Sequence, residues 1–94
     1  MSILKIQGFD WEVIEVGSAE TLGSFGKCNF RLQRIEIAND LNPQKRTSTI
    51  LHEMLEAVKE YKKCKLCHDD MDRLEVGIFE ALTGNGVDLS KLGE

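Results

Sequence analysis

The chain carries, at residues 47–63, the stretch TSTILHEMLEAVKEYKK. Placed on a helix at about 100° per residue, this stretch separates into an apolar and a polar arc. The apolar arc holds Ile50, Leu51, Met54, Leu55, Ala57, Val58 and Tyr61. The polar arc holds Thr49, His52, Glu53, Glu56, Lys59, Glu60 and Lys63. The stretch therefore predicts a helix that lays one face on a hydrophobic layer.

The polar arc contains His52-Glu53-x-x-Glu56, which has the spacing of a metal-binding helix. Side chains four residues apart lie one above the other, so His52 and Glu56 can bind the same ion. Glu53 lies beside them and can carry a proton. The common form of this motif has His where this chain has Glu56. The plainer alternative is a solvated helix surface, because exposed helix faces are usually charged.

The residues before this helix alternate in polarity and predict strands. Residues 3–7 and 11–16, separated by Gly8-Phe9-Asp10, predict a hairpin. Residues 17–26 are rich in glycine and predict an irregular connection. Residues 28–32 and 34–38 predict a second hairpin that turns near Gln33.

The main helix has two candidate starts. Asn42 can cap it with Pro43 in the first position, or Thr47 or Ser48 can cap it further along. It is expected to end near Lys62.

A second helix is predicted from His68 or Asp69 to Leu82, with Gly84 as its C-cap. Residues 87–94 form a tail that packs through Val87, Leu89 and Leu92. The order of elements predicts one α+β domain over residues 1–94, with a small N-terminal antiparallel sheet of three to four strands packed on two C-terminal helices.

Glu75 occupies an unexpected position on the second helix. Its neighbours on the helical wheel are Met71, Leu74, Ile78, Phe79, Ala81 and Leu82. A carboxylate on a core-facing arc costs several kcal/mol unless it is paired or bound to a metal. His68 falls on the same arc, and the first helix offers His52 and Glu56 as partners, so a divalent cation would remove the conflict. The alternatives are that Glu75 reaches solvent or pairs with Lys59.

Residues 47–57, TSTILHEMLEA, resemble the active-site helix of small zincin-like metallopeptidases. The nearest resemblance is to short phage- and prophage-encoded relatives of the ImmA/IrrE-type peptidases. In that family an N-terminal antiparallel sheet precedes the helix, as residues 34–37 do here, and a second helix carries a Glu ligand. The resemblance implies that His52, Glu56 and Glu75 bind the metal and that Glu53 is the general base that activates water.

The Glu at position 56 changes what this resemblance implies. Two carboxylates cancel the charge of a divalent ion, which makes it a weaker Lewis acid. Oxygen-rich ligation lets Mn²⁺ or Fe²⁺ compete with Zn²⁺. His68 would either close the site as a fourth ligand or stand off the metal and stabilise an oxyanion.

Three functions are compatible with these residues. The first is a metal-dependent peptidase or hydrolase whose peptide substrate adds as a strand to the sheet edge near residues 34–38. The second is a catalytically inactive metal-binding derivative that acts as a phage-related regulatory or protein-binding domain. The third is an interaction domain without a metal.

The cysteines admit other interpretations. Cys64-Lys65-Leu66-Cys67-His68 has the spacing of c-type haem attachment, which occurs in exported proteins. Cys64 and Cys67 could also hold zinc with His68 or Cys28, or form a redox pair. The plainest interpretation is three ordinary thiols in a turn or in the core.

The charge and hydropathy of the chain exclude some classes of binding partner. A net charge of −4 and a pI near 5.2 argue against binding of nucleic acid or an anionic membrane. No stretch approaches the ~20 apolar residues of a membrane span, and the N-terminus lacks the organisation of a signal peptide. Three cysteines without an export signal predict a cytoplasmic protein.

Overall fold

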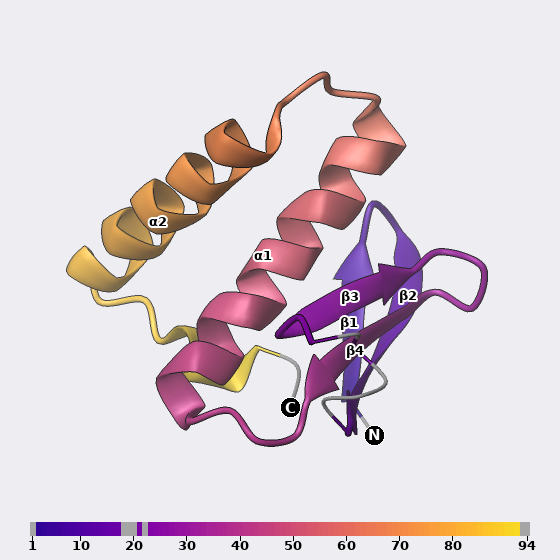
Figure 1. Ribbon diagram of the computed structural model, residues 1–94. Coiled ribbons are helices and arrows are strands. Elements are labelled where there is room, and N and C mark those ends of the chain that lie inside the picture. The colour runs from indigo at the N-terminus through magenta and orange to yellow at the C-terminus, as the bar shows by residue number, and fades with distance from the viewer. Residues whose placement is uncertain (1, 18–20, 22, 93–94) are drawn as a thin grey trace.

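In the computed structural model, a four-stranded sheet is followed along the chain by two helices (Figure 1). The elements are β1 (Ser2–Ile6), β2 (Phe9–Val16), β3 (Gly26–Asn29), β4 (Arg34–Ala38), α1 (Pro43–Lys62), α2 (His68–Gly84) and the short 3-10 helix η1 (Leu89–Lys91). The structure describes residues 2–17, 21 and 23–92. Helix α1 lies between the sheet and α2, so the predicted α+β order is confirmed.

The strands are arranged in the order β1-β2-β4-β3. Both predicted hairpins are present, because β1 pairs with β2 and β3 pairs with β4 in antiparallel fashion. The central pair, β2 with β4, is parallel, so the expectation of a wholly antiparallel sheet is wrong there. Burial suits β4 to this central position, since Ile35, Glu36, Ile37 and Ala38 are all buried. Residues 18–20 and 22 of the predicted connection lie outside the described residues.

The hairpin turns are shifted from their predicted places. Gln7 and Gly8 form the first turn with φ of 51° and 84°, and two successive positive φ values match the twist of flanking strands. Phe9 and Asp10 therefore belong to β2 rather than to the break. The third strand begins at Gly26 and ends at Asn29, earlier than the predicted residues 28–32, because residues 30–33 form the second turn.

The core lies between α1 and the inner face of the sheet. Its largest fully buried side chains include Trp11, Ile35, Ile37 and Ile50. The indole Nε1–H of Trp11 donates a hydrogen bond of 3.1 Å to the hydroxyl of Tyr61. Pairing a buried donor in this way avoids a desolvation cost and fixes the C-terminal half of α1 to the sheet.

Helix α1 begins at the first of its two candidate starts. The side chain of Asn42 accepts a hydrogen bond of 2.8 Å from the backbone N–H of Lys45, and Pro43 occupies the first turn. The helix ends at Lys62, as predicted. Thr49 and Glu53, however, are buried although they lie on the predicted polar arc. The reason is that β3 runs along that face of the helix.

Helix α2 packs mainly against α1, which lies between it and the sheet. Its predicted apolar arc is therefore a poor guide to its core: Met71 is buried, while Leu74 is 45% exposed. The helix includes Gly84, and its C-cap is Asn85 rather than the predicted Gly84.

The C-terminal tail packs partly as predicted. Leu89 is buried and Leu92 is half-buried, but Val87 is exposed. Residues 93–94 lie outside the described residues. No helix in the described part of the chain has the length and apolar character needed to cross a membrane.

Strand β3 approaches α1 so closely that only glycine fits at position 26. A Cβ built on Gly26 would lie 2.9 Å from Thr49 Cγ2 and 3.0 Å from the backbone oxygen of Glu36. The backbone oxygen cannot move without disturbing the ladder between β3 and β4. Gly26 therefore sets the distance between this edge strand and the helix.

This contact can be tested with a pair of Gly→Ala substitutions. We expect Gly26→Ala to lower the free energy of unfolding by about 1–3 kcal/mol, because an added methyl group overpacks the contact. Gly77→Ala is the matched control, since nothing lies within 4 Å of a Cβ there, and it should raise the free energy of unfolding by roughly 0.5–1 kcal/mol as a Gly is removed from a helix interior. Urea denaturation measures both, and equal stability of Gly26→Ala and the unmodified chain would contradict the close contact.

Candidate functional site

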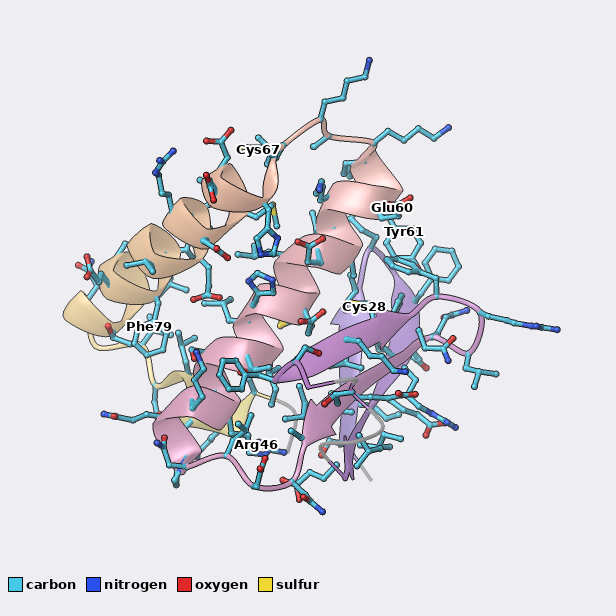
Figure 2. All side chains as sticks on the ribbon, in the orientation of Figure 1. Cys28, Arg46, Glu60, Tyr61, Cys67 and Phe79 are labelled. Carbon is cyan, nitrogen blue, oxygen red and sulfur yellow. The ribbon has the colours of Figure 1, made fainter. Side chains whose placement is uncertain are left out.

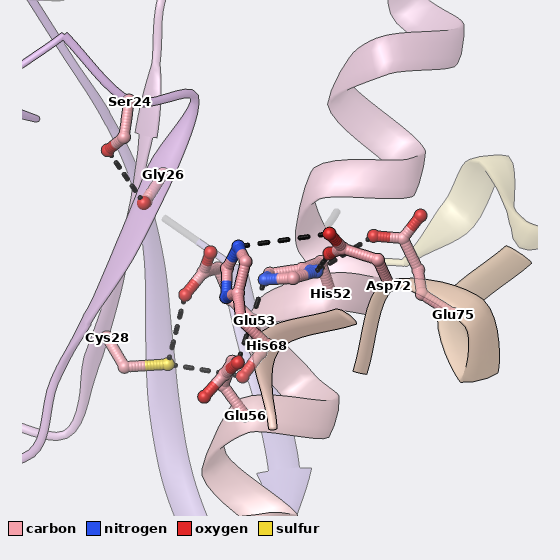
Figure 3. A network of polar contacts seen from close by, with 9 residues as sticks. All are labelled: Ser24, Gly26, Cys28, His52, Glu53, Glu56, His68, Asp72 and Glu75. Carbon is pink, nitrogen blue, oxygen red and sulfur yellow. Dashed lines mark hydrogen bonds and ion pairs between the residues drawn. The ribbon is translucent and has the colours of Figure 1, made fainter. Parts of the chain in front are cut away.

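A cleft of ≈ 900 Å³ lies where β3, α1 and α2 meet. Residues from all three elements line it, and they include every residue that the sequence assigned to the site, namely His52, Glu53, Glu56, His68 and Glu75. Figure 3 shows these side chains together with their polar contacts. The structure thus brings the predicted site residues to one place, although they come from two helices.

His52 is the centre of the polar contacts. Its Nε2 lies 3.8 Å from Glu56 Oε1 on the same helix, which is the expected consequence of their spacing. Its Nδ1 lies 2.9 Å from Glu75 Oε1 on α2. The side chain of Glu75 is 20% exposed, and its carboxylate, which the helical wheel places among apolar neighbours, has His52 as its partner.

Asp72 also belongs to this group, and the sequence analysis did not assign it. Its Oδ1 lies 3.7 Å from His52 Nδ1, and its Oδ2 lies 3.8 Å from His68 Nε2. Asp72 lies four residues after His68 and three before Glu75, so all three share one helix face. That spacing was the signal available in the sequence.

His68 lies at the rim of the cleft. It is the first residue of α2, and 77% of its side chain is exposed. Its ring centroid is 6.1 Å from that of His52. Its polar contact is with Asp72, while Glu75 contacts His52 instead.

Glu53 is buried beneath β3, with 8% of its surface exposed. Burial raises the pKa of its carboxyl group, and the nearby His52 opposes part of that rise. The thiol of Cys28, on β3, donates to the backbone oxygen of Glu53 at 3.1 Å and to its Oε1 at 3.5 Å. These bonds hold the carboxyl group against the edge strand.

Cys28 can serve as a donor because its thiol stays protonated. Burial, and then the charge of Glu53, raise the pKa of this thiol far above its ordinary value. Nothing in the sequence indicated that Cys28 would contact Glu53, since the two residues are 25 positions apart.

The cleft contains more carboxylates than ammonium groups. Glu53, Glu56, Asp72 and Glu75 line it together with Lys27 and Lys45. The ammonium group of Lys27 pairs with Glu36 at 3.4 Å, and that of Lys45 lies 4.3 Å from the centroid of the Phe25 ring. The carboxylates in turn contact the two imidazoles and the thiol of Cys28.

Among residues 2–17, 21 and 23–92, no three His, Cys, Asp or Glu side chains are gathered closely enough to hold a metal ion as they stand. The reason lies in His52, whose Nε2 faces Glu56 while its Nδ1 faces Glu75 and Asp72. The donor types nevertheless suit a divalent ion, because imidazole and carboxylate ligands bind Zn²⁺, Mn²⁺ and Fe²⁺. Their separations of 2.9 to 3.8 Å are close to the roughly 3.4 Å that separates two ligands about 2.1 Å from one ion. The side chains thus offer the donor types of a divalent-ion site, but as they stand they do not converge on one point.

The cysteines do not form a common site. Cys64 and Cys67 are exposed free thiols on the link between the helices. Cys28 lies on β3 and faces α1, away from Cys67 (Figure 2). Within the described residues no three His, Cys, Asp or Glu side chains are grouped to hold a metal, so Cys64 and Cys67 form no zinc site with Cys28 or His68 as they stand.

The sheet edge at the cleft is β3, not β4. The prediction that a peptide adds near residues 34–38 is wrong in its location, because β4 is paired on both sides. Strand β3 lines the cleft, and no other strand in the described part of the chain runs along its outer edge.

Comparisons of this chain with models of protein families, with curated proteins and with solved structures give no match. The resemblance to zincin-like metallopeptidases therefore stays a prediction that depends on residues 47–82.

The contact between Cys28 and Glu53 predicts unequal reactivity of the three thiols. We expect iodoacetamide at pH 8 to modify Cys64 and Cys67 at least tenfold faster than Cys28, because the thiolate is the reactive form and the pKa of Cys28 is raised. Mass spectrometry of timed samples measures the three rates. The control is the chain unfolded in urea, where all three should react alike, and a folded Cys28 as fast as Cys64 would contradict the contact.

Proposed function

We propose that this protein is a metal-dependent hydrolase of peptide bonds. In this proposal His52, Glu56 and Glu75 hold the ion, which is Zn²⁺ or, given the two carboxylates, Mn²⁺ or Fe²⁺, and Glu53 is the general base. The observation that carries it is the gathering of carboxylates around His52 in a cleft that has an unpaired strand edge along one wall.

Electrostatics supports a cation at this place. Glu56, Asp72 and Glu75 all approach one imidazole, and two of them are mostly shielded from solvent. Like charges held together in a part-buried cleft repel one another, and a single imidazolium cannot neutralise three carboxylates. A divalent ion neutralises two, which is why the donor set suits it.

The roles of the remaining residues follow from their positions. A divalent ion in such a site supplies a Lewis acid that polarises a carbonyl group and acidifies water. Glu53 follows His52 in the chain and has its carboxyl group at the cleft, where it can accept a proton from the attacking water and give it to the leaving amine. Cys28 is a positioning residue, because its thiol holds Glu53 Oε1 at 3.5 Å.

The substrate that suits this cleft is an extended peptide. The backbone N–H of Ala38 donates to the backbone oxygen of Phe25. In an antiparallel ladder every second residue directs its backbone N–H and C=O groups to the partner strand, so residues 25, 27 and 29 direct theirs to β4. The backbone groups of Gly26 and Cys28 then point to the outer edge, and the oxygen of Gly26 accepts a bond from the hydroxyl of Ser24. A peptide strand can pair with Cys28, beside Glu53.

A second candidate function is a metal-binding domain without catalysis. It is favoured by Glu56, which lowers the Lewis acidity of an ion, and by the contacts of His52 and His68 with carboxylates, which leave the imidazoles engaged. Such a domain would use the same ligands for stability alone.

Metal binding can be tested with variants of the proposed ligands. We expect elemental analysis of protein purified without chelator to find about one divalent ion per chain, and His52→Ala or Glu75→Gln to weaken binding by at least about tenfold, the minimum seen even for residues that only orient ligands. A chelator should lower the melting temperature of the unmodified chain. Glu80→Gln is the matched control, because Glu80 is exposed on α2. Metal-free protein whose melting temperature no added ion shifts would contradict both candidate functions.

Catalysis is tested at Glu53. Glu53→Gln preserves shape but cannot accept a proton, so hydrolysis of unfolded casein should fall by about 10²–10⁴-fold while metal content stays near one. Unchanged hydrolysis by the Glu53→Gln variant would contradict the role of this residue as general base. A metal-loaded chain that never hydrolyses casein or peptide mixtures identifies the second candidate.

A further inference from the structure

Strand β3 and helix α1 run side by side in the same direction. Contacts between them follow the same order along both elements: Phe25 with Lys45, Cys28 with Glu53, and Phe30 with Tyr61. Lys45 therefore marks one end of the strand and Glu53 its middle. A direction along the cleft is fixed by this order.

A peptide that pairs with β3 in antiparallel fashion, the more stable arrangement, runs from Phe30 toward Phe25. The residues on the C-terminal side of the bond next to Glu53 then come to Lys45. Eight residues of helix separate Glu53 from Lys45, about 12 Å along the axis at 1.5 Å per residue. An extended strand covers that distance in about three to four residues. The ammonium group of Lys45, at the end of its long side chain, can therefore contact the peptide residues that follow the cleaved bond.

Lys45 is the ammonium group at this end of the cleft that has no acidic partner. Its Nζ lies over the ring of Phe25 at 4.3 Å, and it forms no ion pair within the described ranges. Lys27, the other ammonium group of the cleft, is occupied by Glu36. The carboxylates of Glu56, Asp72 and Glu75 surround His52 instead, so the cleft has a negative centre and one positive end.

We propose that Lys45 is a specificity-determining residue that selects peptides with a carboxylate about three residues after the cleaved bond. This inference rests on the proposed hydrolase function. The carboxylate belongs either to an Asp or Glu side chain or to the end of the substrate chain. The ring of Phe25 holds the ammonium group of Lys45 in place through a cation–π contact, which leaves its positive charge available to a substrate.

The test uses a mixture of peptides from a digested proteome and mass spectrometry of the cleaved bonds. We expect the metal-loaded chain to cleave with an enrichment of about 1.5- to 5-fold for a carboxylate two to four residues after the bond, the range that one solvent-accessible ion pair provides. Lys45→Met should abolish the enrichment, and Lys45→Glu should transfer it to Lys and Arg. Lys62→Met is the matched control, because Lys62 is exposed at the other end of α1, and it should leave the enrichment unchanged.

Amidation of the peptide C-termini separates the two sources of the carboxylate. Enrichment that survives amidation identifies Asp and Glu side chains, and enrichment that disappears identifies the end of the chain; both support Lys45. Cleavage without enrichment, or enrichment that Lys45→Glu does not reverse, overturns the role of Lys45 and leaves the hydrolase proposal standing. A chain that cleaves no peptide overturns both.

Discussion

The close packing of β3 on α1 is the constraint on which the site depends. Gly26 allows the approach, the thiol of Cys28 bonds to Glu53, and Phe30 packs near Tyr61. Together these contacts fix a four-residue edge strand along the polar side of the main helix. Glu53 is buried as a result, and the cleft acquires a wall of backbone groups. A strand set further out would leave Glu53 as an ordinary solvated carboxylate.

The sequence predicts those parts of the fold that depend on local chemistry. The bounds of β4 and the end of α1 agree with the structure because alternation and helical periodicity act within a few residues. The parallel pairing of β2 with β4 depends on the path of a long connection, which periodicity does not encode. The burial of Thr49 and Glu53 was missed for the same reason, because the strand that covers them comes from more than twenty positions earlier in the chain.

The candidate site was partly predictable because its residues break local rules. His52 and Glu56 are four apart on a helix, and Glu75 stands among apolar neighbours, so both gave a signal. Lys45 gave none, since a charged residue on an exposed helix turn is ordinary, and the one signal for Asp72 was its spacing from His68 and Glu75. Helix α2 also shows the limit of the helical wheel. Glu75 has the partner that its position required, but in the arc around it only Met71 is fully buried, and Leu74 and Ala81 are exposed, because α2 packs mainly against α1.

The orientation of the His52 ring links these observations. An imidazole binds an ion through one nitrogen, and its other nitrogen then donates its N–H to an acceptor that fixes the ring. In this protein Glu56 approaches Nε2 and Glu75 approaches Nδ1, so each ring nitrogen has a carboxylate near it that can accept a hydrogen bond. In the proposed function both of these carboxylates bind the ion, so the free ring nitrogen would need another acceptor. Asp72, whose Oδ1 lies 3.7 Å from Nδ1, is the carboxylate placed to provide it. In the proposed function Glu56 would also weaken the ion as a Lewis acid, and Glu53 would have to take its proton from a less acidified water.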